Sequence, residues 1–284
     1  MLKDLGVICR MIKIEHSVFA LPFAYMGAFL AADGWPGLYN LLVLTVAMVA
    51  VRSFAMAFNR YADLEIDKEN PRTQDRPLVT GELSTRFTLM FILGTAVIFV
   101  GACAMMNPLC LKLSPFALVL SAFYSFCKRF TYWCHFVLGA VLGLAPVAGW
   151  ICVEPSISLP SVLLFCGVTM WVAGFDLLYA CQDADFDRER GLWSIPARLG
   201  IPAALGISTL SHVTTAAFFL LAGWAAGLGW IYFLVTTVLC AVLMAEHLLV
   251  KADDMSRVNV AFFTMNGVIS VVLFFGTLFD ILAG

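Results

Sequence analysis

Long apolar runs, each near the length needed to cross a bilayer, alternate with short polar segments along the chain. A helix of about 20 apolar residues spans the hydrocarbon core of a membrane. The pattern predicts nine spans, at residues 16–32, 39–59, 86–106, 112–127, 133–152, 159–181, 202–225, 229–250 and 258–281. The fourth is the shortest. We therefore expect an all-α polytopic membrane protein, with about nine transmembrane helices around a central cavity, in one integral membrane domain over residues 1–284.

The composition agrees with this pattern. Hydrophobic residues make up 62% of the chain and charged residues 13%, and the mean hydropathy is +0.92. A water-soluble fold would leave far too much apolar surface in contact with water. The lipid bilayer is therefore an expected partner, and nucleic acid is not.

Basic residues fall almost entirely on one side of the predicted membrane. On the nine-span topology that side carries Lys3, Arg10, Lys13, Arg60, Lys68, Arg72, Arg76, Arg86, Lys128, Arg129, Arg188, Arg190, Arg198, Lys251 and Arg257. The other side carries Lys112. Because lysine and arginine remain preferentially on the cytoplasmic side, we expect a multi-pass protein of the cell (inner) membrane with its polar loops facing the cytoplasm.

Two acidic clusters end long apolar runs on that side. Asp63 and Asp67 form the first, and Asp183 and Asp187 form the second. In a helix the D-x-x-x-D spacing places two carboxylates on one face, where they repel unless a cation lies between them. Carboxylate oxygens suit Mg²⁺, which usually completes its shell with water and substrate phosphate. The clusters therefore predict a divalent-metal diphosphate site, whereas one such cluster alone would fit a solvated helix end.

Several basic residues are predicted to emerge beside the clusters. They are Arg72, Arg76, Lys128, Arg129 and Arg198. Cationic side chains of this kind donate hydrogen bonds to phosphate oxygens. Prolines and glycines after each cluster end the helices there.

The spacing of the clusters predicts an internal repeat. Asp183 follows Asp63 by 120 positions, and four predicted spans lie between them. An even number of spans returns the chain to the same membrane face, so the two units would be parallel copies that share one cavity.

Charge is also predicted inside the membrane, at Arg52 and Asp176. Arg52 lies on one helical face with Asn59 and Asp63, and Asp176 lies on one face with the second cluster. A charge at that depth is tolerated when it faces a bundle interior or a wet cavity. Two interpretations stay open: a role in binding or deprotonating a substrate, and an Arg52–Asp176 ion pair that fixes helix packing.

Four polar segments form a larger pattern: Asn59-Arg60-x-x-Asp63-x-x-x-Asp67, Asn70-Pro71-Arg72-Thr73 with Arg76-Pro77-Leu78, Lys128-Arg129-Phe130-Thr131, and Tyr179-Ala180-x-x-Asp183-x-x-x-Asp187-x-x-x-Gly191-x-x-Ser194. In this pattern the chain resembles the UbiA superfamily of intramembrane prenyltransferases. It looks most like the 4-hydroxybenzoate polyprenyltransferase type. Phe175-Asp176 and the segment from Ser194 to Arg198 look like a bacterial branch linked to menaquinone made through futalosine. Arg60 departs from the many relatives that carry an acid there, which favours a phosphate or carboxylate contact over a metal ligand.

The resemblance implies a reaction and roles for residues. Mg²⁺ would be held by Asn59, Asp63, Asp67, Asp183 and Asp187. A polyprenyl diphosphate would lose its diphosphate, and the allylic cation would attack a ring carbon of an aromatic acid acceptor, 4-hydroxybenzoate or 1,4-dihydroxy-6-naphthoate, in ubiquinone or menaquinone biosynthesis. Asp176 joins the four acids as a catalytic candidate. The substrate-binding candidates are Arg52, Asn59, Arg60, Arg72, Arg76, Lys128, Arg129, Tyr179, Ser194 and Arg198.

Other classes fit the pattern less well. A secondary transporter also has repeats and intramembrane charge, but acids gathered at one membrane face beside many arginines suit a diphosphate better than a permeation path. The chain contains no D-x-x-D-G-x-x-A-R run, which is typical of the CDP-alcohol phosphotransferase family. Two acidic sites also argue against a non-catalytic quinone-binding protein.

Overall fold

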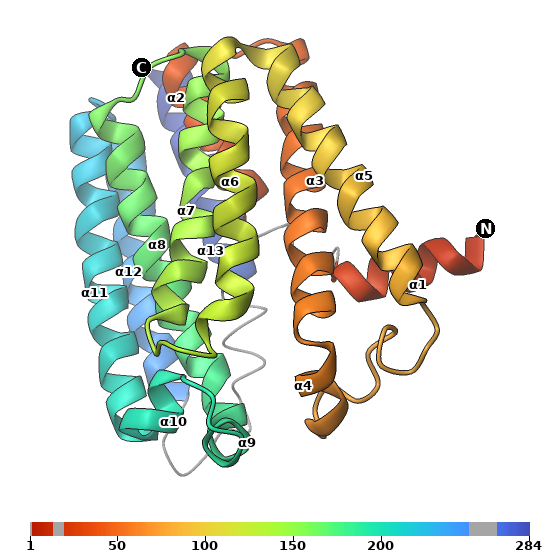
Figure 1. The fold of residues 1–284 in the computed structure, drawn as a ribbon. Coiled ribbons are helices and arrows are strands. Elements are labelled where there is room, and N and C mark those ends of the chain that lie inside the picture. The colour runs from red at the N-terminus through yellow and green to blue at the C-terminus, as the bar shows by residue number, and fades with distance from the viewer. Residues whose placement is uncertain (1, 14–19, 250–265) are drawn as a thin grey trace.

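The computed structural model describes residues 2–13, 20–249 and 266–284 (Figure 1). These residues form α1 (Leu2–Ile12), α2 (Leu21–Ala32), α3 (Leu38–Ala62), α4 (Leu64–Glu69), α5 (Thr85–Met106), α6 (Pro108–Cys127), α7 (Cys134–Val153), α8 (Leu159–Ala180), the single 3-10 turn η2 (Cys181–Asp183), α9 (Ala184–Glu189), α10 (Ile195–Leu199), α11 (Ile201–Ala225), α12 (Trp230–Leu249) and α13 (Asn266–Ala283). The protein is all-α over the part of the chain that is described, as the sequence predicts.

Eight helices among the described residues are long and apolar enough to cross a membrane, and α2 is a shorter apolar helix. The second to eighth predicted spans match helices within a few residues. Residues 16–19 of the first predicted span and 258–265 of the ninth lie outside the described residues, and the remainders form α2 and α13. The fourth helix is longer than predicted, because Asn107 caps it and Pro108 occupies its first turn.

Small residues let the membrane helices pack closely. A Cβ atom on Gly27 of α2 would lie 2.0 Å from the carbonyl oxygen of Pro146 in α7. One on Gly149 of α7 would lie 1.8 Å from the carbonyl oxygen of Ala24 in α2. Close backbone approach of this kind is how membrane helices gain packing energy when lipid removes the hydrophobic driving force.

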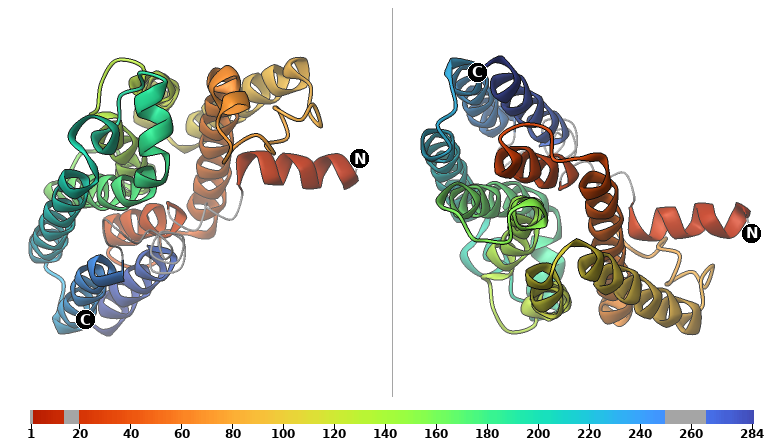
Figure 2. Two further views of the ribbon diagram at one scale, coloured as in Figure 1. Left: turned by 90° about the horizontal axis from the view of Figure 1, so that it is seen from below. Right: turned by 90° about the horizontal axis from the view of Figure 1, so that it is seen from above.

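Buried apolar clusters link the helices of the bundle. The largest joins α2, α7, α8, α11, α12 and α13 around Trp171 and reaches α3 at Leu44. A second joins α3, α5, α6 and α7, and a third joins α1, α3 and α5. Figure 2 views the bundle along its length and shows α1 extending away from it. The short helices α4, α9 and α10 lie together at the lower end in Figure 1, where the polar loops gather. Lys112 lies near the start of α6, at the opposite end.

Candidate active site

A cavity of about 340 Å³ is enclosed mainly by α3, α6, α7 and α8. Its wall contains most of the polar residues that the sequence singles out. These are Arg52, Asn59, Arg60, Asp63, Asp67, Arg72, Arg76, Lys128, Asp176, Tyr179, Asp183, Asp187 and Ser194. The predicted central cavity is therefore confirmed, and it contains both acidic clusters.

Each cluster begins at a bend in the helix that carries it. Asp63 lies between α3 and α4 with φ −95° and ψ 7°, and Asp183 precedes α9 with φ −102° and ψ 5°. Both values fall in the sparsely populated bridge region between the helical and extended basins. The chain bends at the first aspartate of each cluster and continues as a six-residue helix that carries the second aspartate.

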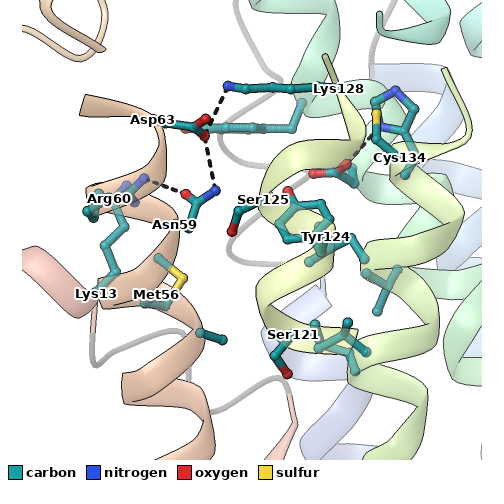
Figure 3. Close-up of a pocket in the computed structure, with 18 of the residues that line it drawn as sticks. Lys13, Met56, Asn59, Arg60, Asp63, Ser121, Tyr124, Ser125, Lys128 and Cys134 are labelled. Carbon is teal, nitrogen blue, oxygen red and sulfur yellow. Dashed lines mark hydrogen bonds and ion pairs between the residues drawn. The ribbon is translucent and has the colours of Figure 1, made fainter. Parts of the chain in front are cut away.

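Asp63 is almost fully buried and is surrounded by donors. Asn59 Nδ2 donates to its Oδ2 atom at 3.1 Å, and Lys128 Nζ lies 3.2 Å from the same oxygen (Figure 3). Arg129 Nη2 lies 3.4 Å from Oδ1 and also donates to the carbonyl oxygen of Ala62. Arg129 therefore caps the end of α3 from outside the cavity wall, where cationic groups complement the helix dipole.

The remaining acid of the first cluster, Asp67, is also paired with a cation. Arg76 Nη1 donates to its Oδ2 atom at 2.5 Å, and only 6% of the Asp67 side chain is exposed. Arg60 is buried, and its Nη1 atom donates to Oδ1 of the neighbouring Asn59 at 3.2 Å. Arg60 also lies in the cavity wall, and its predicted contact with a phosphate or carboxylate stays a prediction.

The second cluster is held by the loop that follows the first. Arg72 forms a two-pronged ion pair with Asp183, through Nε at 2.8 Å and through Nη2. Asn70 Nδ2 donates to Asp183 Oδ1 at 3.1 Å, and Arg72 Nη1 donates to the Tyr179 hydroxyl at 2.9 Å. Burial by itself lowers the pKa of Arg72, but the hydrogen bonds and charge of Asp183 outweigh it and raise that pKa above its ordinary value.

Asp187 has a neutral partner. The Ser194 hydroxyl donates to its Oδ2 atom at 2.8 Å, and the same hydroxyl accepts from the backbone N–H of Ala197 at the start of α10. Ser194 therefore caps α10 and supports Asp187 at once. Arg198, one turn later, is exposed, stacks 4.0 Å from the ring centroid of Trp193 and donates to Gly191; it lies outside the cavity wall. The structure does not bring Arg198 into the site.

Asp176 lines the cavity from α8, about two helical turns before Asp183. Its Oδ2 atom lies 2.7 Å from Nδ1 of His135, on α7. The alternative of an Arg52–Asp176 ion pair is wrong, because among the described residues the partner of Asp176 is His135. Arg52 lies in the cavity wall beside apolar residues.

Sequence reasoning missed His135 and Asn70 as members of the site. The sequence assigns no role to His135, and it includes Asn70 in the UbiA-like pattern without a role in the site. His135 follows the basic pair by six residues and Asn70 follows Asp67 by three, and this nearness is the signal in the sequence, but their partners Asp176 and Asp183 come from distant segments.

The donor set fits a magnesium ion shared with a phosphate ligand. Carboxylates from both clusters and the side-chain amides of Asn59 and Asn70 line the cavity, and all can offer hard oxygen donors. Among the residues that the structure describes, no three His, Cys, Asp or Glu side chains are gathered closely enough to hold a metal alone. Such an arrangement suits an ion that takes part of its shell from substrate phosphate.

Away from the acids the cavity becomes apolar. Its wall there includes Met48, Phe99, Leu138, Leu142 and Phe175, with hydroxyl groups from Ser121, Tyr124 and Ser125. The cavity therefore has a charged mouth and an apolar interior, which matches an amphiphilic ligand with an anionic head and a hydrocarbon tail.

Comparison with known proteins agrees with this geometry. Residues 20–268 match the model of the UbiA prenyltransferase family. A 4-hydroxybenzoate octaprenyltransferase from Hydrogenovibrio crunogenus is 27% identical over 91% of this chain and 90% of its own. A solved UbiA homologue from Aeropyrum pernix K1 is 35% identical, with a TM-score of 0.85 over 94% of this chain and 98% of that one. A UbiA homologue from Archaeoglobus fulgidus bound to GPP and Mg²⁺ shares the fold, at 18% identity and a TM-score of 0.73 over 98% of this chain and 100% of that one. The match over most of the chain, together with the charged cavity that both acidic clusters share, places this protein in the UbiA prenyltransferase family.

Proposed function

We propose that this protein transfers a polyprenyl group from a polyprenyl diphosphate to a ring carbon of a hydroxylated aromatic acid, with Mg²⁺ as cofactor. The single observation that carries the proposal is the cavity, in which two acidic clusters and the cations paired with them, Arg72, Arg76 and Lys128, surround the mouth of an apolar chamber. The names of the relatives and the GPP and Mg²⁺ bound by the Archaeoglobus fulgidus homologue support it.

Binding of the diphosphate is assigned to residues at the mouth. Asn59, Asp63, Asp67, Asp183 and Asp187 would hold Mg²⁺, which neutralises the diphosphate and stabilises the charge that develops on it. Arg72, Arg76 and Lys128 donate hydrogen bonds to the remaining phosphate oxygens. These three cations contact carboxylates of the clusters in the structure, so they already lie within reach of the same ligand.

Transfer then needs three changes of bonding. The bond between the terminal prenyl carbon and the diphosphate oxygen breaks, and its electron pair leaves with the diphosphate. A π-electron pair of the acceptor ring forms the new carbon–carbon bond to the allylic cation. The ring carbon loses its proton to the Asp176 carboxylate, which restores aromaticity. The apolar wall around Phe175 and Leu142 keeps water from trapping the cation.

The acceptor is the finer part of the proposal. The relatives' names favour 4-hydroxybenzoate, whereas the resemblance of the Phe175 and Ser194–Arg198 segments to the futalosine branch favours 1,4-dihydroxy-6-naphthoate and menaquinone biosynthesis. We propose that the cavity mouth faces the cytoplasm, because the basic residues gather at that end of the bundle.

A transfer assay in membranes tests the proposal. The purified protein in lipid nanodiscs is given a polyprenyl diphosphate and either aromatic acid, with Mg²⁺ or with EDTA. We expect a prenylated acid that depends on Mg²⁺, and the better acceptor identifies the branch. Failure to prenylate either acid would overturn the proposed function.

A further inference from the structure

The only hydrogen-bond partner of Asp176 among the described residues is a histidine from a different helix. His135 lies in the first turn of α7, and its Nδ1 atom is 2.7 Å from Asp176 Oδ2. The side chain of His135 is 3% exposed and that of Asp176 is 19% exposed. Both residues line the cavity. The pair therefore occupies a buried part of the wall with one carboxylate oxygen, Oδ1, left for the cavity.

The far side of the imidazole fixes which nitrogen carries the proton. The backbone N–H of Ile195 donates to His135 Nε2, at 3.3 Å. Because a backbone N–H can only donate, we assign Nε2 as the acceptor and place a ring proton on Nδ1. His135 therefore donates to Asp176 and orients the Asp176 carboxylate. A hydrogen-bond partner behind a functional side chain commonly orients it in this way.

Ile195 belongs to a segment that is bound to the loop before α7 at several points. The backbone N–H of Trp193 donates to the carbonyl oxygen of Lys128 at 2.6 Å, and the Cys134 thiol donates to the carbonyl oxygen of Trp193 at 3.5 Å. Ser194, between Trp193 and Ile195, donates to Asp187. One short segment thus contacts both an acid of the metal cluster and the imidazole that holds Asp176.

We propose that His135 is a positioning residue that aims Asp176 at the acceptor ring and makes that aim depend on the segment Trp193–Ile195. This inference rests on the proposed function, because it assigns the ring proton to Asp176 Oδ1. In this arrangement the ring C–H bond breaks, its electrons return to the ring, and the proton moves to Oδ1 while Oδ2 keeps its bond to His135. When metal and diphosphate hold Asp187 in place, its bond to Ser194 also holds the neighbouring Ile195. Ile195 in turn fixes the His135 ring that positions Asp176.

Substitutions at His135 separate positioning from packing. His135→Leu removes both hydrogen bonds and keeps an apolar side chain of similar volume, so we expect kcat to fall about tenfold to 100-fold, the loss typical of a hydrogen bond to a charged group. The KM for the polyprenyl diphosphate stays within about twofold. His135→Gln carries one donor and one acceptor in its amide, so it should restore kcat to within about threefold of the native enzyme.

A double-mutant cycle gives the decisive readout. If His135 acts through Asp176, adding His135→Leu to Asp176→Asn lowers kcat by less than about twofold more, because the interaction is already lost. Additive losses in kcat, with a lower melting temperature in detergent and no rescue by His135→Gln, would show a structural role and overturn the inference. Unchanged kcat in His135→Leu would overturn it as well.

Two controls keep the test interpretable. His135→Asn places its amide near the Nδ1 position but is too short to reach Ile195, so it tests the same link if the leucine variant does not fold; its kcat should fall, and native kcat would contradict the link to Ile195. Native enzyme that prenylates neither acid would defeat the proposed function itself. If the native enzyme is active and the His135 variants keep its kcat, only this inference is defeated.

Discussion

The two acidic clusters have nearly the same backbone but different partners. Asp63 and Asp183 share the same bend, and each is followed by a six-residue helix that carries the second acid. Both acids of the first cluster contact cations, whereas in the second cluster Asp187 contacts the Ser194 hydroxyl. The repeat therefore preserved the geometry that presents oxygen atoms to the cavity while the surroundings diverged.

The divergence separates two tasks. Seven residues before the first aspartate of each cluster, the first half has Met56 and the second half has Asp176. Both side chains line the cavity. On the proposed function, only the second half therefore has an acid that could serve the acceptor. Arg72 links the halves, because it lies in the loop after the first cluster and its side chain forms an ion pair with Asp183 of the second cluster. We therefore propose that the halves are equivalent toward the metal and diphosphate and unequal toward the acceptor.

The largest expected effect tests the equivalence. Asp63→Asn and Asp183→Asn should each lower kcat about 100-fold or more, because metal stabilisation of the leaving group is worth several kcal/mol. Prenyl transfer by the two variants is compared with that of Asp185→Asn, whose side chain is 90% exposed and pairs with Arg188. Near-normal Mg²⁺-dependent transfer by either cluster variant would remove that half from the metal site.

The next effect concerns the cations at the mouth. Arg72→Ala and Lys128→Ala should lower kcat/KM for the polyprenyl diphosphate about tenfold to 100-fold, because charged hydrogen bonds to phosphate are lost. Arg188→Ala, at a half-exposed pair, serves as the control and should change little. A change mainly in the KM of the aromatic acid would show that Arg72 and Lys128 contact the acceptor and not the diphosphate.

A smaller effect is expected where the halves differ most. Ser194→Ala removes a helix cap, at about 1 kcal/mol of stability, and frees Asp187. Ser84→Ala removes a comparable cap from α5, where Ser84 accepts from the N–H of Phe87. Both should lower the melting temperature in detergent by similar amounts, but only Ser194→Ala should raise the KM for the polyprenyl diphosphate. An equal KM in both variants would mean that Ser194 is only a cap.

The smallest effect is expected at Arg198. Its guanidinium stacks on Trp193 outside the cavity wall, so Arg198→Ala should change kcat/KM by less than about twofold, as exposed pairs contribute little. Steady-state kinetics with both substrates measures this. A loss comparable to that of Arg72→Ala would return Arg198 to the diphosphate site.

The sequence by itself determined the helices, the repeat and the chemistry of the mouth. Apolar runs must become spans, and an even number of spans brings Asp63 and Asp183 to one membrane face whatever the packing. Residues next to the clusters in sequence, such as Asn59 and Arg76, were predicted for the same reason: a few residues of chain cannot carry a side chain far from its neighbour.

The tertiary structure decided the pairings. The partner of Asp176 is His135, 41 positions earlier, and that of Asp183 is Arg72, 111 positions earlier. Arg198 fits the charge pattern but turns outward to Trp193. Periodicity specifies which face of a helix a residue occupies, but which helix packs opposite that face depends on close contacts such as Gly27 against Pro146. Those contacts depend on shape along the whole length of two helices, and the linear pattern of apolar and charged residues does not contain it.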